Sequence, residues 1–413
     1  MRVLEGKAAL RRVSELSGRS QKTSTEDARV QTIVQDVRRN GDSALRKYAG
    51  SWDALPNGKC LYVAPEEMQA AWNKLPVDAR AALRKAAARI RQFCRWQMPR
   101  EWRRTNRGIS LGQIIRPLHS VGCYVPGGRY PLPSTLLMTV IPAQVAGVRE
   151  IRIVSPNPQP ATLAAAAMLG VREFYRIGGA QAVAALAYGT ESVPHVQKIV
   201  GPGNSFVTAA KKLVAFDCST DMLAGPTETV ILLESGNPVF IASDLVAQSE
   251  HDSEALSVFI TASRDLAVAV AKETSRLSAT NATARAACNK NGSVLLAPCH
   301  EQAIDWANGI APEHITVASQ DLDAIQSAGS IFVGEYSSQA AGDYASGPNH
   351  VLPTGGYART RGGLSVFDFL KVITVQELSA RGAKRLGPTV VQLAELEGLH
   401  GHARSMRLRC SHA

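Results

Sequence analysis

Short apolar segments alternate with amphipathic segments through most of the chain after residue 110. Runs of four or five apolar residues, bounded by glycine, proline or serine, predict strands, whereas apolar positions three or four residues apart predict helices. The predicted strands are 151–154, 174–177, 230–233, 257–261, 294–297, 315–318 and 330–333, and the predicted helices between them are 161–169, 180–188, 238–251 and 265–277. This order of strand, turn and helix predicts parallel sheets covered by helices, which is the α/β class.

The alternation falls into two blocks that divide near residues 224–229. The first 110 residues are charged and mostly helical in pattern, and the pattern from about residue 366 onward is again helical and ends in a basic tail. A chain of 413 residues is too long for one ordinary domain, so two or three lobes are expected.

Charge and cysteine content narrow the class of protein. The formal net charge is +11, and basic residues crowd the segment 78–104, which fits either a nucleic-acid surface or a long amphipathic helix with a solvated basic face. We favour the helix, with Ala81, Leu83, Ala87 and Ile90 packed inward. The seven cysteines form no C-x-x-C pair, no apolar run is long enough to span a membrane, and the N-terminus lacks a signal peptide pattern. A cytoplasmic protein without a membrane segment or a specific nucleic-acid partner is expected.

Glycine-rich turns follow several predicted strands, where phosphates can meet helix N-termini. They are Val125-Pro126-Gly127-Gly128, Gly178-Gly179-Ala180-Gln181 and Gly201-Pro202-Gly203-Asn204. Neither G-x-G-x-x-G nor a Walker A sequence occurs, so these turns alone indicate either a nucleotide site or merely tight connections.

Imidazole, amide and carboxylate groups recur in three further segments. Gln248 and His251 are three residues apart near a predicted helix end, so they could converge on one metal ion, or His251 could simply cap the helix. Asp343 lies in a loop, as a metal ligand or a turn former. Glu313 and His314 are adjacent, and both can reach one cleft only if the backbone bends there, which Pro312 permits.

These pieces occur in an order that resembles the histidinol dehydrogenase family. The resemblance covers about residues 121–404 and is carried by GCYVPGGRYPLPSTLLM, IGGAQAVAALAYGTESVP, VGPGNSFV, AGPTE, ASDLVAQSEH, APEH, GDYASGPNHVLPTGG, TVQEL and EGLHGHA. It implies two incomplete Rossmann-like parallel-sheet domains with smaller helical N- and C-terminal extensions. The implied boundaries are 1–20 for an N-terminal helical extension, 21–123 with 229–364 for the metal and catalytic domain, 124–228 for the NAD domain, and 365–413 for a C-terminal helical tail.

The resemblance also implies an activity: the four-electron oxidation of L-histidinol to L-histidine through L-histidinal. This last step of histidine biosynthesis uses two NAD⁺ in sequence and one Zn²⁺ per subunit, in a homodimer with shared active sites. Residue by residue, it assigns catalysis to Glu313 and His314, and zinc to Gln248, His251, Asp343 and His402. Its substrate contacts are Thr227, Gln248, His251, His314, Asp343, His350, Glu397 and His402, and its NAD contacts are Tyr124, Gln181 and Asn204. Glu397 and His402 would reach the partner subunit's site.

This sequence departs from the family pattern at two of these motifs. Thr227 stands where serine is common and keeps the hydroxyl, and Ser249 stands where alanine is usual, on the helix face away from the metal. Three alternatives remain: a paralogous dehydrogenase for another primary alcohol, separable by assay with histidinol; a zinc hydrolase using Glu313, separable by NADH formation; and a nucleic-acid binder, separable by the salt dependence of a gel shift.

Overall fold

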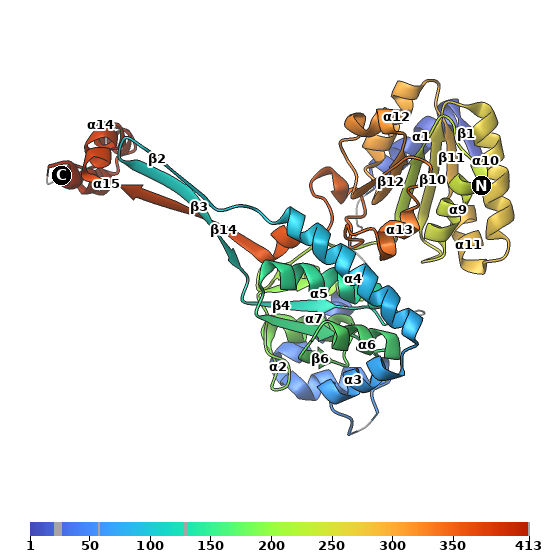
Figure 1. The fold of residues 1–413 in the computed structure, drawn as a ribbon, viewed down its shortest axis with the longest axis horizontal. Helices are drawn as coiled ribbons and strands as arrows, with labels where there is room; N and C mark the ends of the chain where they lie inside the picture. Colours follow the sequence, from blue (N-terminus) through green and yellow to red (C-terminus); the bar gives the residue numbers. More distant parts are fainter. Residues whose placement is uncertain (20–26, 57, 128–130, 412–413) are drawn as a thin grey trace.

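The chain forms two α/β lobes and a long arm that carries its C-terminus (Figure 1). The computed structural model describes residues 1–19, 27–56, 58–127 and 131–411. Gly128 of the first glycine-rich turn lies outside the described residues. No helix among the described residues is long and apolar enough to cross a membrane.

The first lobe is built on a six-stranded parallel sheet in the order β1-β11-β10-β9-β12-β13. Its strands are β1 (Arg2–Glu5), β9 (Glu228–Leu232), β10 (Leu256–Thr261), β11 (Ser293–Leu296), β12 (His314–Val317) and β13 (Ser330–Val333). Every residue of β9, β10, β11 and β12 is buried, as expected for strands covered on both faces. The covering helices are α1 (Gly6–Ser17), α9 (Pro238–Ser249), α10 (Arg264–Ser278), α11 (Ala282–Lys290), α12 (His300–Ile310) and α13 (Gln339–Tyr344).

The second lobe is built on a five-stranded parallel sheet in the order β6-β5-β4-β7-β8. Its strands are β4 (Ser120–Tyr124), β5 (Glu150–Val154), β6 (Glu173–Tyr175), β7 (Lys198–Val200) and β8 (Ser219–Thr220). Its helices are α2 (Asp27–Trp52), α3 (Pro65–Lys74), α4 (Val77–Gln97), α5 (Pro133–Ala146), α6 (Pro160–Met168), α7 (Gly179–Tyr188) and α8 (Ser205–Val214). Helix α5 is apolar all round and buried, because α4 covers the face that β4 leaves open.

The arm is a three-stranded antiparallel sheet that ends in two packed helices (Figure 1). It consists of β2 (Trp102–Asn106), β3 (Ile109–Pro117), β14 (Leu370–Leu378), α14 (Ala380–Leu396) and α15 (His400–Ser411). The arm lies away from both lobes, and it leaves apolar side chains such as Val372, Leu393 and Leu396 exposed.

The structure differs from the expected domain division in three respects. Residues 1–20 are not only helical, since Arg2–Glu5 pairs in parallel with β11. Helices α2, α3 and α4 pack against helices α5 to α8 of the five-stranded lobe, although they were expected to belong with residues 229–364. An amphipathic pattern shows which face of a helix is buried but not against which lobe. The segment from residue 365 is not a purely helical tail, because its strand β14 pairs with β3 along nine residues.

The α/β class and each strand predicted from the apolar pattern are confirmed. The basic helix exists as α4, with Ala87 and Ile90 buried, but Ala81 is exposed and Arg103 and Arg104 belong to β2. Cys123 is fully buried in β4.

Candidate active site

Seven of the nine residues expected to serve catalysis, metal or substrate line one cavity. It has a volume of about 310 Å³ and lies where the two lobes meet. The seven are Thr227, Gln248, His251, Glu313, His314, Asp343 and His350. The five-stranded lobe contributes the turn residues after β4 and β7, including Pro126, Pro202 and Gly203, and the start of α5 with Thr135.

Glu313 and His314 reach this cavity together because the backbone turns sharply before β12. Helix α12 ends at Ala311, which has a left-handed conformation (φ 50°), and Pro312 follows. Glu313 Oε2 lies 3.7 Å from His314 Nδ1, and the two residues are only 7% and 2% exposed. The bend that the sequence argument required for a shared cleft is therefore present.

Both groups have a shifted pKa. Burial raises the pKa of Glu313 to about 8, although the nearby imidazole and the Glu228 N–H act in the opposite direction. Burial acts to lower the pKa of His314, but the Glu313 and Asp343 carboxylates outweigh it, so the net pKa is raised. Neither ring nitrogen of His314 has a hydrogen-bond partner among the described residues. Since buried polar atoms are nearly always satisfied, these nitrogens are available to a ligand.

Asp343 lies at the centre of the polar contacts in the cavity. Gln248 Nε2 donates to Asp343 Oδ2 at 2.8 Å, and His314 Nε2 lies 3.5 Å from Asp343 Oδ1. Burial acts to raise the pKa of Asp343, but contact with the His314 imidazole outweighs it and lowers the pKa. His350 Nδ1 lies 2.7 Å from the Asp343 carbonyl, and His350 Nε2 lies 3.3 Å from Thr135 Oγ1. Burial lowers the pKa of His350, which favours the neutral imidazole.

The sequence around α9, the helix that carries Gln248, explains where the helix begins and which face it turns to the cavity. Asn237 accepts a hydrogen bond from the Val239 N–H at the start of α9, and Pro238 occupies its first turn. Ser249 points away from the cavity and bonds to the Leu245 carbonyl and Ser257, as expected for the far face of the helix. His251 lies two residues beyond the end of α9 and is exposed at the cavity wall.

Glu397 and His402 are not in this cavity. Glu397 caps the end of α14 and His402 lies in α15, at the far end of the arm from α9 and α13 (Figure 1). Correspondingly, no group of three or more His, Cys, Asp or Glu side chains that could hold a metal occurs among the described residues. Within one chain, Gln248, His251 and Asp343 supply three of the four expected donors, and the amide is one of them.

The three expected NAD residues lie at the carboxyl edge of the five-stranded sheet. The Tyr124 hydroxyl accepts a hydrogen bond from the Gly179 N–H at 3.0 Å, and Gln181 Nε2 donates to Asp53 at 3.1 Å. Asn204 is exposed and caps α8 by accepting from the Val207 N–H. Gln181 Oε1 is buried and has no partner among the described residues, so it is free to accept from a ligand.

Asp53 and Thr135 were not found from the sequence. Asp53 Oδ2 accepts from the Gly178 N–H at 2.9 Å and from Gln181, and the residue lines a second cavity of about 210 Å³ beside Pro126, Gly127 and Pro156. A lone aspartate after a helix, 125 residues from its partner, carries no local signal. Thr135 lies in the first turn of a mostly apolar helix, 215 residues from His350, so their contact was equally invisible.

The match to a known family decides what this arrangement is. The family model described as histidinol dehydrogenase matches residues 16–410. The chain belongs to the histidinol dehydrogenase family. Proteins of that name from Methanothermobacter thermautotrophicus and Methanosarcina barkeri are 46% and 45% identical, over 97% and 92% of this chain and 97% and 91% of their own length. The crystal structure of histidinol dehydrogenase from Elizabethkingia anophelis superposes with a TM-score of 0.94 at 33% identity, covering 100% of this chain and 98% of that one. Membership in the histidinol dehydrogenase family makes the protein an oxidoreductase.

Proposed function

We propose that the protein oxidises L-histidinol to L-histidine through L-histidinal, using two NAD⁺, as the last step of histidine biosynthesis. The observation that carries this proposal is the convergence of Glu313, His314, Gln248, Asp343 and His350 on one cavity. Two imidazoles, two carboxylates and an amide around one small cavity suit a polar substrate with an amino group, a hydroxyl group and an imidazole ring.

Gln248, His251 and Asp343 would hold a zinc ion, with His402 of a second copy as the fourth ligand. The donors fit, because Zn²⁺ accepts mixed nitrogen and oxygen ligands and because Gln248 and Asp343 already lie within hydrogen-bond distance of each other. When bound, the ion would supply an anchoring point for the amino and imidazole nitrogens of the substrate.

His314 is the proposed proton acceptor during both hydride transfers. Its ring nitrogens are unpartnered and border the cavity, so one of them can take the hydroxyl proton as the hydride leaves the carbinol carbon for NAD⁺. Glu313 is proposed to remove a proton from water so that it adds to the aldehyde, which gives the hydrate for the second oxidation. A carboxyl group with a pKa near 8 is well matched to taking up and releasing protons near neutral pH.

NAD⁺ is proposed to bind at the carboxyl edge of the five-stranded sheet, with Tyr124, Gln181 and Asn204 as contacts. Turns that follow parallel strands are the usual place for a dinucleotide. Here the turns after β4 and β7 border the 310 Å³ cavity, so a cofactor at this edge can bring its reactive ring to the substrate.

A homodimer would complete the site. The arm carries Glu397 and His402 away from their own lobe, and a second, larger cavity of about 740 Å³ opens beside His251 and Asp343. Leu83 of α4 and Leu137 of α5 line this cavity, and exposed leucines on the arm, such as Leu396 and Leu399, would match them. An arm exchanged between two copies would bury both apolar surfaces and deliver His402.

The decisive experiment measures the amount of NADH formed per histidinol consumed. A ratio near two is expected if both oxidation steps occur, whereas a ratio near one would exclude the four-electron reaction. Chelation should remove activity and added zinc should restore it, and His402→Asn should lower the metal content.

The shared site has its own test. Mixing inactive His251→Asn and His402→Asn subunits should restore activity, because each mixed dimer would hold one intact site. Absence of recovery despite demonstrated subunit exchange would contradict the exchanged arm.

A further inference from the structure

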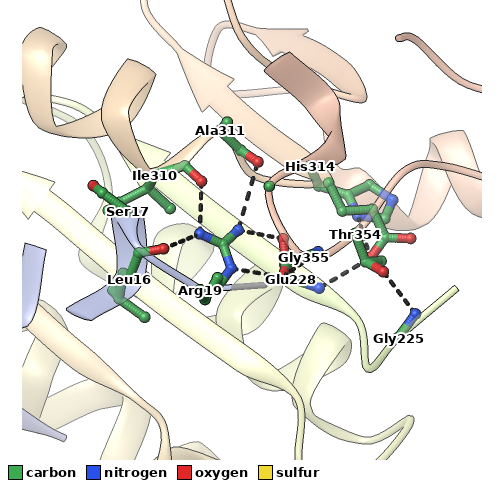
Figure 2. Close-up of polar contacts among 12 residues, drawn as sticks. Leu16, Ser17, Arg19, Gly225, Glu228, Ile310, Ala311, His314, Thr354 and Gly355 are labelled. Carbon is green, nitrogen blue, oxygen red and sulfur yellow. Dashed lines mark hydrogen bonds and ion pairs between the residues drawn. The ribbon is translucent and has the colours of Figure 1, made fainter. Parts of the chain in front are cut away.

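A largely buried ion pair joins Arg19, which follows α1, to Glu228, the first residue of β9 (Figure 2). Arg19 Nε donates to Glu228 Oε1 at 2.8 Å and Nη2 donates to Oε2 at 2.5 Å, so the pair is bidentate. The side chains are only 17% and 7% exposed. Burial of this kind is costly unless the remaining donors and acceptors are also satisfied.

The remaining groups of the pair are satisfied by backbone atoms from three other segments. Arg19 Nη1 donates to the Leu16 carbonyl at the end of α1 and to the Ile310 carbonyl at the end of α12. The guanidinium also lies 3.5 Å from the Ala311 carbonyl, and Glu228 Oε1 accepts from the Gly355 N–H at 2.9 Å. Figure 2 shows the guanidinium between the carbonyls of Leu16, Ile310 and Ala311 and the Glu228 carboxylate.

The pair is connected to Glu313 in two ways. The backbone N–H of Glu228 donates to Glu313 Oε2 at 2.9 Å, across the adjacent strands β9 and β12. Arg19 Nη1 donates to the Ile310 carbonyl at 2.6 Å, and the next residue, Ala311, adopts the left-handed conformation that starts the bend two residues before Glu313. Arg19 therefore holds the strand that carries the donor and the turn that carries the acceptor.

We propose that Arg19 and Glu228 are positioning residues for the Glu313 carboxylate. With Oε2 fixed by the Glu228 N–H, Oε1 is the oxygen left to face a water molecule in the cavity. The Arg19–Glu228 pair fixes the relative position of β9 and the turn at Ala311, and so fixes this orientation. The inference rests on the proposed role of Glu313 as the group that activates water.

The pair is also the point at which the N-terminal segment contacts the catalytic machinery. Arg19 follows α1, whereas its partners lie near residues 228 and 310. A purely structural clasp would stabilise the lobe without favouring one chemical step. A positioning pair would affect the step that depends on Glu313 more than the other.

The test compares Arg19→Met and the milder Arg19→Lys with the wild-type holoenzyme. Lysine keeps the charge but cannot form the two-pronged contact. Single-turnover NADH formation is measured separately from histidinol and from histidinal, together with the thermal midpoint. We expect Arg19→Met to slow histidinal oxidation by about tenfold or more and histidinol oxidation by less than about threefold, with Arg19→Lys intermediate. No slowing of either step would overturn the proposal, and so would equal slowing of both steps by Arg19→Met when Glu313→Gln slows only the histidinal step.

Arg152→Met provides a matched control for loss of a buried arginine. Arg152 is paired with Glu150 and Glu173 in the five-stranded lobe and contacts neither β9 nor β12. This variant should lower the thermal midpoint without any selective effect on the aldehyde step. If its two rates change in the same ratio as those of Arg19→Met, the selectivity does not come from the pair.

A double-mutant comparison separates this inference from the proposed role of Glu313. Arg19→Met added to Glu313→Gln should cause no further loss in either step if Arg19 acts through Glu313, whichever step Glu313 serves. If Glu313→Gln alone slows both steps equally, the proposed division of labour fails while the positioning role can still hold. Full additivity of the two losses would overturn the positioning role itself.

Discussion

The two sheets present opposite edges to the same cavity. The five-stranded sheet offers its carboxyl edge, through the turns that follow β4 and β7, and contributes mainly backbone, proline and glycine. The six-stranded sheet offers its amino edge, where Thr227 precedes β9 and Glu313 and His314 begin β12. The titratable side chains of the cavity therefore come from the six-stranded lobe.

The difference shows that the usual rule for α/β proteins applies to only one of the lobes. Ligands commonly bind outside the carboxyl ends of parallel strands, where helix N-termini and backbone N–H groups gather. The five-stranded lobe follows this rule and suits an anionic dinucleotide. The other lobe presents strand starts and the C-terminal end of α9, which bring imidazole and carboxylate groups together instead. Chemistry and cofactor binding should therefore be separable by mutation.

The largest expected effect is a loss of turnover, and it should follow from a substitution at the amino edge of the six-stranded sheet alone. His314→Asn should lower the rates of both oxidation steps by about 10²–10⁴-fold, because the group proposed to accept the hydroxyl proton in each hydride transfer is lost. The dissociation constant for NAD⁺, measured by titration, should stay within about twofold.

His300→Asn is the matched control for this prediction. His300 contacts Glu234 and Asp321 at the opposite, carboxyl edge of the same sheet. Its replacement should leave turnover unchanged. Comparable losses in the two variants would show that the amino edge has no special role.

The carboxyl edge of the five-stranded sheet depends on a buried ion pair for its shape. Lys211 Nζ donates to Asp221 Oδ1 and to the Gly201 carbonyl, while Asp221 Oδ2 accepts from the Gly201 N–H. Lys211→Met should destabilise the protein by about 3–5 kcal/mol, because it leaves a buried carboxylate without its partner. Urea unfolding measures this loss.

The double variant Lys211→Met with Asp221→Asn should recover part of that stability, since the unpaired charge is gone. A loss below about 1 kcal/mol in the single variant would mean that the turn does not rely on the pair.

The apolar pattern predicted seven strands correctly, but it missed β4 and β7 inside the five-stranded sheet and gave little of the long-range assembly. Central strands such as β9 and β10 are continuous apolar runs, which the pattern reveals directly. In contrast, β1 and β14 are short or exposed strands at sheet edges, and nothing in their own residues names β11 or β3 as a partner. The placement of α2 to α4 failed for the same reason.

For the candidate site too, local sequence patterns were informative and long-range contacts were not. Local spacing suggested Gln248 with His251 and Glu313 with His314, and the cavity contains all four. The contacts of Asp53 with Gly178 and of Arg19 with Glu228 join residues more than 100 positions apart, so no spacing rule could indicate them. The remoteness of His402 is a property of the arm, which becomes visible only when β14 is paired.

A smaller effect should appear in the pH dependence of the free energy of unfolding. It should come from Asp53, at the carboxyl edge of the five-stranded sheet. Burial raises the pKa of Asp53 to about 6, against an ordinary value of 3.8, although the Gly178 N–H and Gln181 act to lower it. Because the folded state holds this proton more tightly, its contribution to stability is present below about pH 4 and is lost as the pH rises through about 6. The loss amounts to roughly 2–3 kcal/mol.

Asp53→Asn should remove this slope. The comparison is the free energy of unfolding of the wild type and the variant from pH 4 to 7, since their difference cancels the other titrating groups. Tyr124 interacts electrostatically with Asp53, but burial raises its pKa, so it ionises far above this range. If the free energies of unfolding of the wild type and the variant changed in parallel with pH, a protonated Asp53 in the folded protein would be contradicted.

The smallest effect separates a structural role of Asn204 from its proposed contact with NAD⁺. Its side chain caps α8 by accepting from the Val207 N–H at 3.1 Å. Asn204→Ala should therefore cost about 1 kcal/mol of stability, and Asn204→Ser should restore most of it, because serine also caps.

Asn281, which caps α11 in the other lobe, supplies the matched control. Asn281→Ala should cost a similar amount and leave NAD⁺ affinity unchanged. If the Asn204 amide contacts the cofactor, Asn204→Ser will regain stability but not NAD⁺ affinity, whereas recovery of both would show that Asn204 only caps the helix.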